Sequence, residues 1–196
     1  IDGTHVALVR PTEHEERFFN RKHYHSRNVQ IVSILCNTQF YFIFYYLLAH
    51  TIQLLIIHYL QLFSGDSGYP LRPWLLTPII HANPRSAEEH YTDVHCRAKN
   101  TVERCIGVLK SRWRCLLSHR VLHYNHHVVA KIINACAVLH NIANRHKLPV
   151  PELAVDDAQR EADIRVPRPP YYEENQELEG GKQQRQIIVQ RLWRNI

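Results

Sequence analysis

Three carboxylates in this chain, Asp2, Asp66 and Glu103, stand in contexts that suit metal chemistry better than solubility. Asp66 lies in a glycine- and serine-rich segment (GDSG, 65–68) directly after an apolar run, where a strand would end in a turn. Glu103 is the only acidic residue beside seven lysines and arginines in the stretch 97–120. Hard cations such as Mg²⁺ prefer oxygen ligands, and two such ions can drive an in-line displacement at phosphorus. These residues therefore predict a divalent metal site for phosphodiester chemistry.

The positive charge of the chain is concentrated in that same stretch. The net charge is +6, with 24 lysines and arginines against 18 acidic residues, and the stretch 97–120 alone accounts for it. Clustered positive charge is typical of proteins that bind phosphate backbones, although a solvated basic helix face is the simpler alternative. The residues predicted to contact a DNA backbone are Arg97, Lys99, Arg104, Lys110, Arg112 and Arg114.

Glu103 must be positioned by a helix. Apolar side chains recur at helical spacing on one stripe, namely Val102, Ile106, Leu109, Trp113 and Leu116. Glu103 lies about 100° around the helix from that stripe, with Lys110 and Arg114 on its own face. The alternative is a surface glutamate that pairs with Arg97 or Arg104 for at most about 1 kcal/mol.

The other elements predict a mixed α/β protein. Residues 5–9 and 28–36 are rich in β-branched side chains and read as strands, so Asp2 would lie on or beside the first strand. A second helix is expected over 126–146, with an apolar face made of Val129, Ile132, Ile133, Cys136, Leu139 and Ala143.

Residues 41–63 form an anomalous apolar run without a single charged side chain. By length and hydropathy the run qualifies as a transmembrane segment, although polar residues such as His50, Gln53 and His58 interrupt it. The alternatives are a buried helix, a pair of strands, or translated noncoding sequence from a wrong or decayed gene model.

Several motifs carry a family resemblance: IDGTHVALVRP, NRKHYHSRNVQIV, GDSGYPLRPWLLTPI, VERCIGVLKSRWRCL and ACAVLHNIA. With these motifs, the chain resembles the PIF/Harbinger transposases and the Harbinger transposase-derived nucleases over most of 1–35 and 65–145. The resemblance implies an RNase H-like fold of the DDE transposase type and an Asp-Asp-Glu triad at Asp2, Asp66 and Glu103. It also implies Mg²⁺ or Mn²⁺ as cofactor, DNA as substrate, a separate Myb-like DNA-binding partner and work in the nucleus. A homo-oligomer and a presence in the cytoplasm stay open.

Residues 36–64 lack the strand, the loop and the helix that the family has there, so the RNase H-like core is expected to be incomplete. The LHN motif at Leu139, His140 and Asn141 is interpreted as core packing rather than catalysis. We expect an endonuclease-like domain over 1–148, an acidic flexible linker over 149–181 and a short helix over 182–196. The linker is predicted because residues 152–179 hold nine acidic residues and a PRPP segment.

Other chemistries have weaker support in the sequence. Cys115, His119 and His123 are spaced by four residues and could contribute to a zinc site, but no fourth ligand stands in a usual pattern. The odd number of cysteines, without a CxxC pair, indicates a reducing compartment. Three functions follow: a metal-dependent endonuclease, an inactive domesticated or misassembled transposase fragment that at most binds nucleic acid, or a small membrane protein spanning through 41–63.

Overall fold

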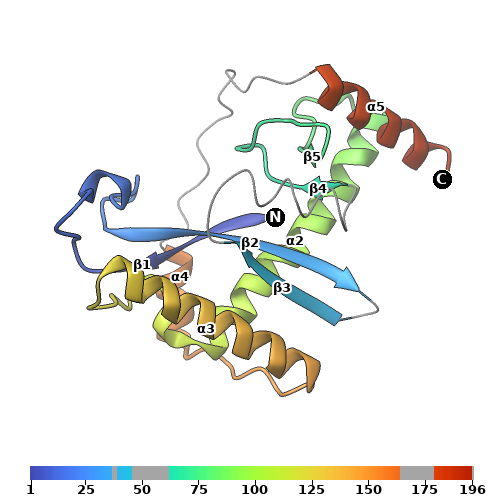
Figure 1. Cartoon of the computed structure of the whole chain (residues 1–196). Helices are drawn as coiled ribbons and strands as arrows, with labels where there is room; N and C mark the ends of the chain where they lie inside the picture. The colour runs from blue at the N-terminus through green and yellow to red at the C-terminus, as the bar shows by residue number, and fades with distance from the viewer. Residues whose placement is uncertain (37–38, 46–61, 164–178, 196) are drawn as a thin grey trace. The chain divides into compact units, whose positions relative to one another are not determined.

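The computed structural model describes residues 1–36, 39–45, 62–163 and 179–195 and has a mixed α/β architecture (Figure 1). The chain divides into two compact units. Unit 1 comprises Ile1–Asp2, Leu47–Glu103 and Pro169–Ile196, and unit 2 comprises Gly3–Tyr46 and Arg104–Arg168. Each unit has its own apolar core.

Unit 2 contains a sheet with the strand order β1-β2-β3, formed by β1 (Asp2–Ala7), β2 (Ser26–Cys36) and β3 (Gln39–Tyr45). β2 and β3 are antiparallel, with a register that runs from Gln30 opposite Tyr45 to Cys36 opposite Gln39. The 3-10 helix η1 (Glu15–Arg17) lies between β1 and β2. The strand predicted over 28–36 is confirmed, and the first strand begins earlier than predicted, at Asp2 itself.

The anomalous run of 41–63 is only partly described. Its first residues, 41–45, belong to β3, which agrees with the strand-pair interpretation for that portion. Residues 46–61 lie outside the described residues. Among the helices within the described ranges, none is both long and apolar enough to cross a membrane.

Helix α3 (His126–Arg145) supplies one side of the core of unit 2. The side chain of Asn125 caps it by accepting a hydrogen bond from the Val128 amide at 2.9 Å. The core combines α3 with β1, β2 and the end of α2 (Ala87–Arg112), and its buried members are Val6, Leu8, Val29, Ile31, Cys105, Leu109, Leu116, Leu122, Val129, Ile133 and Cys136.

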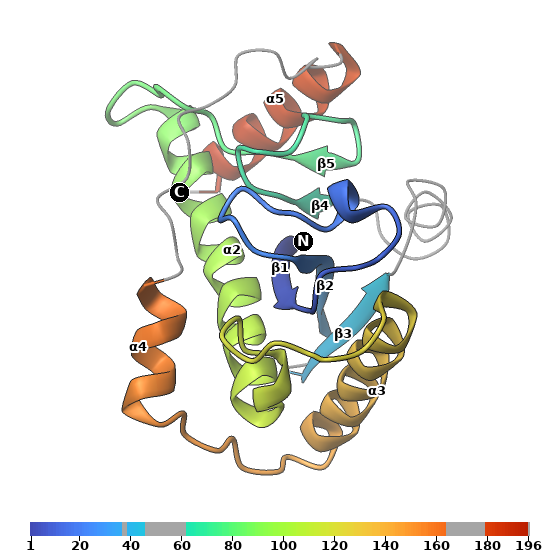
Figure 2. The same ribbon diagram turned by 90° about the vertical axis from the view of Figure 1, so that its left-hand side faces the viewer.

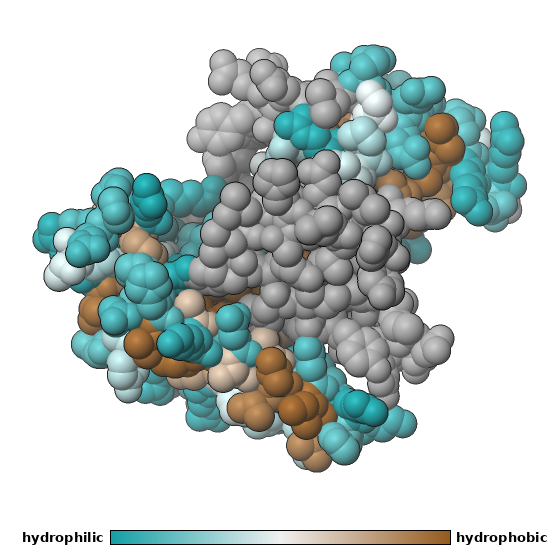
Figure 3. Space-filling model, in the orientation of Figure 1, coloured by the Kyte–Doolittle hydropathy of each residue, from teal (hydrophilic) through white to brown (hydrophobic). Residues whose placement is uncertain are grey.

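The buried stripe of α3 differs in one place from the predicted stripe. Leu139 is 47% exposed, whereas His140 is completely buried. Residues 129, 133, 136, 140 and 143 follow the helical period more closely than a stripe through 139, so the histidine takes the core position. Figure 3 shows apolar surface over the C-terminal half of α3, where Val138, Leu139 and Ile142 are exposed.

His140 is held by a short polar chain. Arg112 donates to the amide oxygen of Asn144, which leaves the Asn144 Nδ2 to donate to His140 Nε2 at 2.9 Å. Burial lowers the pKa of His140 to about 4, and the nearby charge of Arg112 acts in the same direction. The interpretation of the LHN motif as core packing fits this arrangement.

Helix α2 ends earlier than its apolar stripe suggests. At Trp113 the backbone leaves the helical region (φ −117°, ψ 77°), and the 3-10 helix η2 (Arg114–Leu116) follows. Leu116 still reaches the core, but Arg114 does not share the helical face of Glu103 as predicted.

A helix, α4 (Val155–Asp163), stands inside the segment predicted to be a flexible linker. Its Glu161 is paired with Lys110 at 2.9 Å and accepts hydrogen bonds from the amide and hydroxyl of Ser118. Burial opposes ionisation of Glu161, but Lys110 and Ser118 together hold its pKa below the usual value. Acidic composition predicted a solvated segment here, and this buried ion pair is what makes α4 a packed element instead.

Unit 1 contains two short parallel strands, β4 (Phe63–Ser64) and β5 (Leu75–Leu76), with α5 (Glu179–Trp193) beside them (Figure 2). Its core is formed by Leu71, Leu76, Tyr91 and Val189. α5 approaches closely at Gly181, where an added Cβ would lie 3.0 Å from the Leu71 side chain and 3.1 Å from the Arg72 backbone. The short helix predicted over 182–196 corresponds to α5, which begins at Glu179 and ends at Trp193.

We expect Ile133→Ala to lower the free energy of unfolding by about 2–5 kcal/mol, because it leaves a cavity in the core of unit 2. Ile142→Ala is the matched control, since the same substitution on the same helix removes a side chain that is 49% exposed and should change stability by about 0.5 kcal/mol or less. Urea unfolding of both variants checks this, and equal losses would contradict the assignment of the core face.

Stability should fall as the pH drops from about 6.5 toward about 4, because the unfolded state then binds a proton that buried His140 does not. The depressed pKa of His140 corresponds to about 3 kcal/mol of stability, complete above pH 6.5 and lost toward pH 4. His140→Gln should flatten this dependence in urea unfolding at several pH values. Burial also lowers the pKa of His5 and His95, so a smaller slope should remain. His146→Gln, at an exposed position, is the matched control and should leave the stability nearly unchanged.

Candidate functional site

Asp66 stands in a tight turn directly after β4, as the sequence predicted. The Gly65 amide donates to the Leu76 carbonyl at 2.9 Å, which extends the strand pairing to the edge of the turn. The Gly68 amide then donates to Asp66 Oδ1 at 2.8 Å and the Tyr69 amide to the Asp66 carbonyl at 3.1 Å. One carboxylate oxygen therefore shapes the turn, and the other, Oδ2, is directed toward α2.

Four residues of α2 in unit 1, Tyr91, His95, Lys99 and Glu103, follow one another at intervals of four and so share one helical face. The Tyr91 hydroxyl donates to the Thr77 carbonyl at 3.0 Å, and His95 Nε2 lies 2.7 Å from the Gly65 carbonyl oxygen. This face holds the segment from β4 to β5 by main-chain contacts on both sides of the turn.

His95 is buried where it contacts the turn, with 6% of its surface exposed. Because the Gly65 carbonyl can only accept, Nε2 must carry the proton, and the other ring nitrogen can accept from the Ser64 hydroxyl, 3.3 Å away. Burial lowers the pKa of His95, against the opposing effect of the bond to Gly65. The neutral ring thus contacts the Gly65 backbone and the Ser64 side chain, and so positions the chain where β4 enters the turn.

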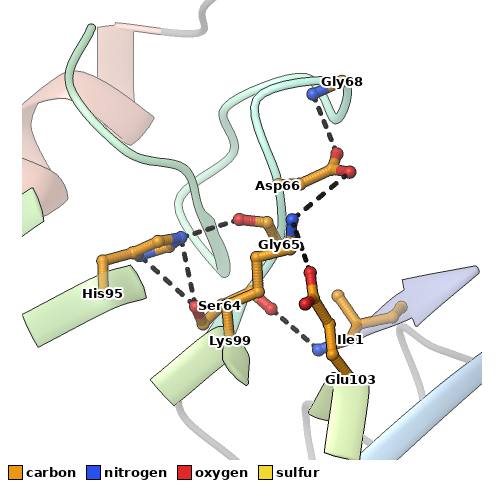
Figure 4. A network of polar contacts seen from close by, with 8 residues as sticks. All are labelled: Ile1, Ser64, Gly65, Asp66, Gly68, His95, Lys99 and Glu103. Atoms are coloured by element: carbon orange, nitrogen blue, oxygen red, sulfur yellow. Dashed lines mark hydrogen bonds and ion pairs between the residues drawn. The ribbon is translucent and has the colours of Figure 1, made fainter. Parts of the chain in front are cut away.

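Asp66 and Glu103 meet at a single cation, the side chain of Lys99 (Figure 4). Lys99 Nζ lies 3.8 Å from Asp66 Oδ2 and 3.4 Å from Glu103 Oε1. The separation of the two carboxylate oxygens cannot exceed the sum of these distances. The structure therefore brings together two of the three predicted metal ligands, from a turn and a helix far apart in the sequence.

Asp2 enters the same unit through its neighbour Ile1. The Ile1 nitrogen donates to the Ser64 carbonyl at 2.7 Å, so the chain segment that carries Asp2 begins beside β4. The Ile1 contact places the start of the chain in unit 1 with Asp66 and Glu103, and the role of Asp2 as a third ligand stays a prediction.

The donor set can be compared with what a divalent ion needs. Asp66 and Glu103 offer hard oxygen donors with 19% and 36% of their side chains exposed, which suits Mg²⁺ or Mn²⁺ with water completing the shell. Within the described part of the chain, no three His, Cys, Asp or Glu side chains form a group arranged to hold a metal. The carboxylates fit such an ion chemically, provided that Lys99 moves away from them.

The zinc alternative has no support in unit 2. Cys115 Sγ lies 3.9 Å from Cys136 Sγ, and His119 Nε2 is paired with Asp157 at 3.0 Å. The helix α2 ends before residue 115, so Cys115, His119 and His123 do not occupy successive turns of one helix.

The predicted DNA contacts fall into two groups. Arg97, Arg104 and Arg114 are exposed, as phosphate contacts must be. Lys99 and Lys110 are buried in ion pairs, with Asp66 and Glu103 in the first case and Glu161 in the second. Arg112 donates to Asn144 and to the Leu148 carbonyl. Their roles on DNA stay predictions, and both lysines have a structural partner that sequence reasoning missed.

Sequence reasoning also missed His95 and Tyr91. Their spacing of four residues from Lys99 and Glu103 was a visible signal, because one helical face would carry all four side chains. The spacing could not identify the hydrogen-bond partners of these two side chains. The carbonyls of Gly65 and Thr77 come within reach of them only through the packing of unit 1.

Residues 47–141 match the model of a DDE superfamily endonuclease. The resemblance to transposase-derived nucleases is confirmed. This match includes Asp66 and Glu103 and not Asp2, and it begins inside the segment 36–64 that the motifs alone left outside the resemblance.

Curated relatives agree with the family match. The proteins named "Putative nuclease HARBI1" of Bos taurus and Homo sapiens are each 39% identical over 87 residues, which is 44% of this chain and 25% of theirs. "Protein ALP1-like" of Arabidopsis thaliana is 33% identical over 78 residues, which is 40% of this chain and 19% of that protein. The chain thus spans about a quarter of the length of the nuclease relatives. No solved structure matches it.

We expect His95→Leu to loosen the Asp66 turn, because it leaves the buried Gly65 carbonyl without its donor at a cost of about 1–3 kcal/mol. Hydrogen exchange at the Gly68 amide, which bonds to Asp66, should become faster. His95→Gln keeps an N–H donor on a side chain of similar reach and should lose less protection. Equal protection in the leucine variant and the wild type would show that His95 does not hold the turn.

Proposed function

We propose that this chain is the catalytic region of a metal-dependent DNA endonuclease of the Harbinger transposase-derived type, with an RNase H-like core. One observation carries the proposal: Asp66 and Glu103, both inside the DDE endonuclease match, converge on a single cation position. Carboxylates that share a cation at a strand end and a helix face are what phosphodiester hydrolysis by this class of enzyme requires.

Asp66, Glu103 and Asp2 would hold one or two Mg²⁺ or Mn²⁺ ions. When bound, such an ion supplies an activated water and neutralises charge on the leaving oxygen. The chain's own part is to orient the ligands: the Gly68 amide fixes Asp66 through Oδ1, and His95 fixes the backbone in front of it. The exposed guanidinium groups of Arg97, Arg104 and Arg114 would bind backbone phosphates by charge-assisted hydrogen bonds.

The relatives bear on the wider setting of this activity. These relatives are named as nucleases, which supports a nucleic acid as the substrate, and DNA is the one we propose. The nucleus as the place of work follows from the family resemblance alone. A separate Myb-like DNA-binding protein stays part of the proposal as what the family resemblance implies, and a homo-oligomer stays open.

A second candidate is a derivative that binds nucleic acid without cleaving it. The placement of Lys99 favours it, because an ammonium group already neutralises the two carboxylates. A further Arabidopsis relative, 31% identical over 78 residues, is named as an antagonist of a heterochromatin protein rather than as a nuclease.

Cleavage of supercoiled plasmid DNA in the presence of Mn²⁺ tests the first candidate. Asp66→Asn and Glu103→Gln should each reduce the rate by more than the roughly 10–100-fold typical of groups that only support a ligand, because each removes a ligand itself. Asp2→Asn should do the same if Asp2 completes the site.

Asp93→Asn is the matched control, since it removes an exposed carboxylate from the same helix and should leave the rate unchanged. Cleavage that survives both Asp66→Asn and Glu103→Gln would refute the ligand assignment. Salt-sensitive DNA binding without any cleavage would favour the second candidate.

A further inference from the structure

Lys99 carries its positive charge at an unusually buried position. Only 8% of the residue is exposed, although an ammonium group loses strong hydration when it is buried. Its Nζ is within ion-pair distance of two carboxylates, Asp66 on the turn and Glu103 one helical turn further along α2. The two acidic partners offset the desolvation of the lysine.

The two carboxylates are in turn stabilised by the positive charge of Lys99. Two negative charges brought close to one point repel each other, and a cation placed between them offsets that repulsion. Glu103 is carried by the same helix as Lys99, whereas Asp66 comes from a turn whose position depends on contacts to that helix. The ammonium therefore links the turn to the helix at the point where both proposed metal ligands meet.

We propose that Lys99 is a resident counter-ion of the site, which holds Asp66 and Glu103 together in the absence of a metal and which a divalent cation must displace in order to bind. This inference depends on the proposed function, because it assigns the metal to the same two carboxylates. Lys99 affects metal binding in two ways: its charge holds the two carboxylates near each other, and its ammonium group competes with the metal ion for them.

The competition can be tested without any measurement of activity, by titrating Mn²⁺ into the full 196-residue chain. The electron paramagnetic resonance signal of the unbound ion reports how much Mn²⁺ stays free. Lys99→Met keeps an unbranched side chain of similar length and removes its charge. This variant should bind Mn²⁺ about five- to tenfold more tightly, which is the effect of removing one partly screened ion pair. Its thermal unfolding temperature without metal should fall, and added Mn²⁺ should raise that temperature more than in the wild type.

Two further variants separate this effect from other causes. Arg97→Met removes one positive charge from the exposed side of the same helix, two residues away, and should change the affinity by less than about twofold. Lys99→Arg keeps the charge and should bind Mn²⁺ no more tightly than the wild type. It also keeps the test decisive if the methionine variant fails to fold, because tighter binding by Lys99→Arg would overturn the inference.

The remaining outcomes distinguish the inference from the function on which it rests. If the wild type binds Mn²⁺ and loses it in Asp66→Asn, but Lys99→Met binds no more tightly, the counter-ion role is wrong and the metal site stands. If neither the wild type nor Lys99→Met binds Mn²⁺, both are wrong. Tighter binding in Lys99→Met that persists when Glu103→Gln is added would place the ion elsewhere and would also overturn the inference.

Discussion

The arrangement of unit 1 depends on one face of α2 meeting the turn after β4. Tyr91 and His95 donate hydrogen bonds to the Thr77 and Gly65 carbonyls, and Lys99 forms an ion pair with the Asp66 carboxylate. Each contact satisfies a polar group that packing removes from water, so the face is constrained at three successive turns of the helix. The apolar residues around Tyr91 then fill the space behind these contacts.

Unit 2 also contains a buried lysine of α2 that is paired with a carboxylate. Lys110 is buried against Glu161, whose other oxygen accepts from Ser118, and this pair fastens α4 to the end of α2. A buried ion pair contributes little net stability compared with apolar packing, but the loss of one partner leaves the other charge buried. Both lysines on α2 that were expected to face DNA are therefore engaged inside the protein, and the outward charge of this helix and of η2 is carried by arginines.

The distribution of charge bears on the chemistry of the site. Arginine presents a planar fork that matches phosphate oxygens, whereas lysine is a compact point charge that can occupy the same position as a small metal ion. The exposed arginines suit a nucleic-acid backbone, and Lys99 suits the gap between two carboxylates. The arginines and lysines of one basic stretch therefore stand in different settings: Arg97, Arg104 and Arg114 face outward, whereas Lys99 and Lys110 are paired with carboxylates inside the protein.

The sequence by itself determined the local elements and the candidate ligands. Helical period located α2 and α3, β-branched runs located β2, and a glycine-rich segment after an apolar run placed Asp66 at a strand end. These features depend on neighbours within a few residues, which is why a pattern in one dimension predicts them. Only the tertiary structure decided that His140 rather than Leu139 faces the core, that α4 packs through Glu161, and that Lys99 lies between Asp66 and Glu103. Each of these outcomes depends on a partner brought close by folding, and the free energy of a buried charge or hydrogen bond is set by that partner rather than by the residue's place in the sequence.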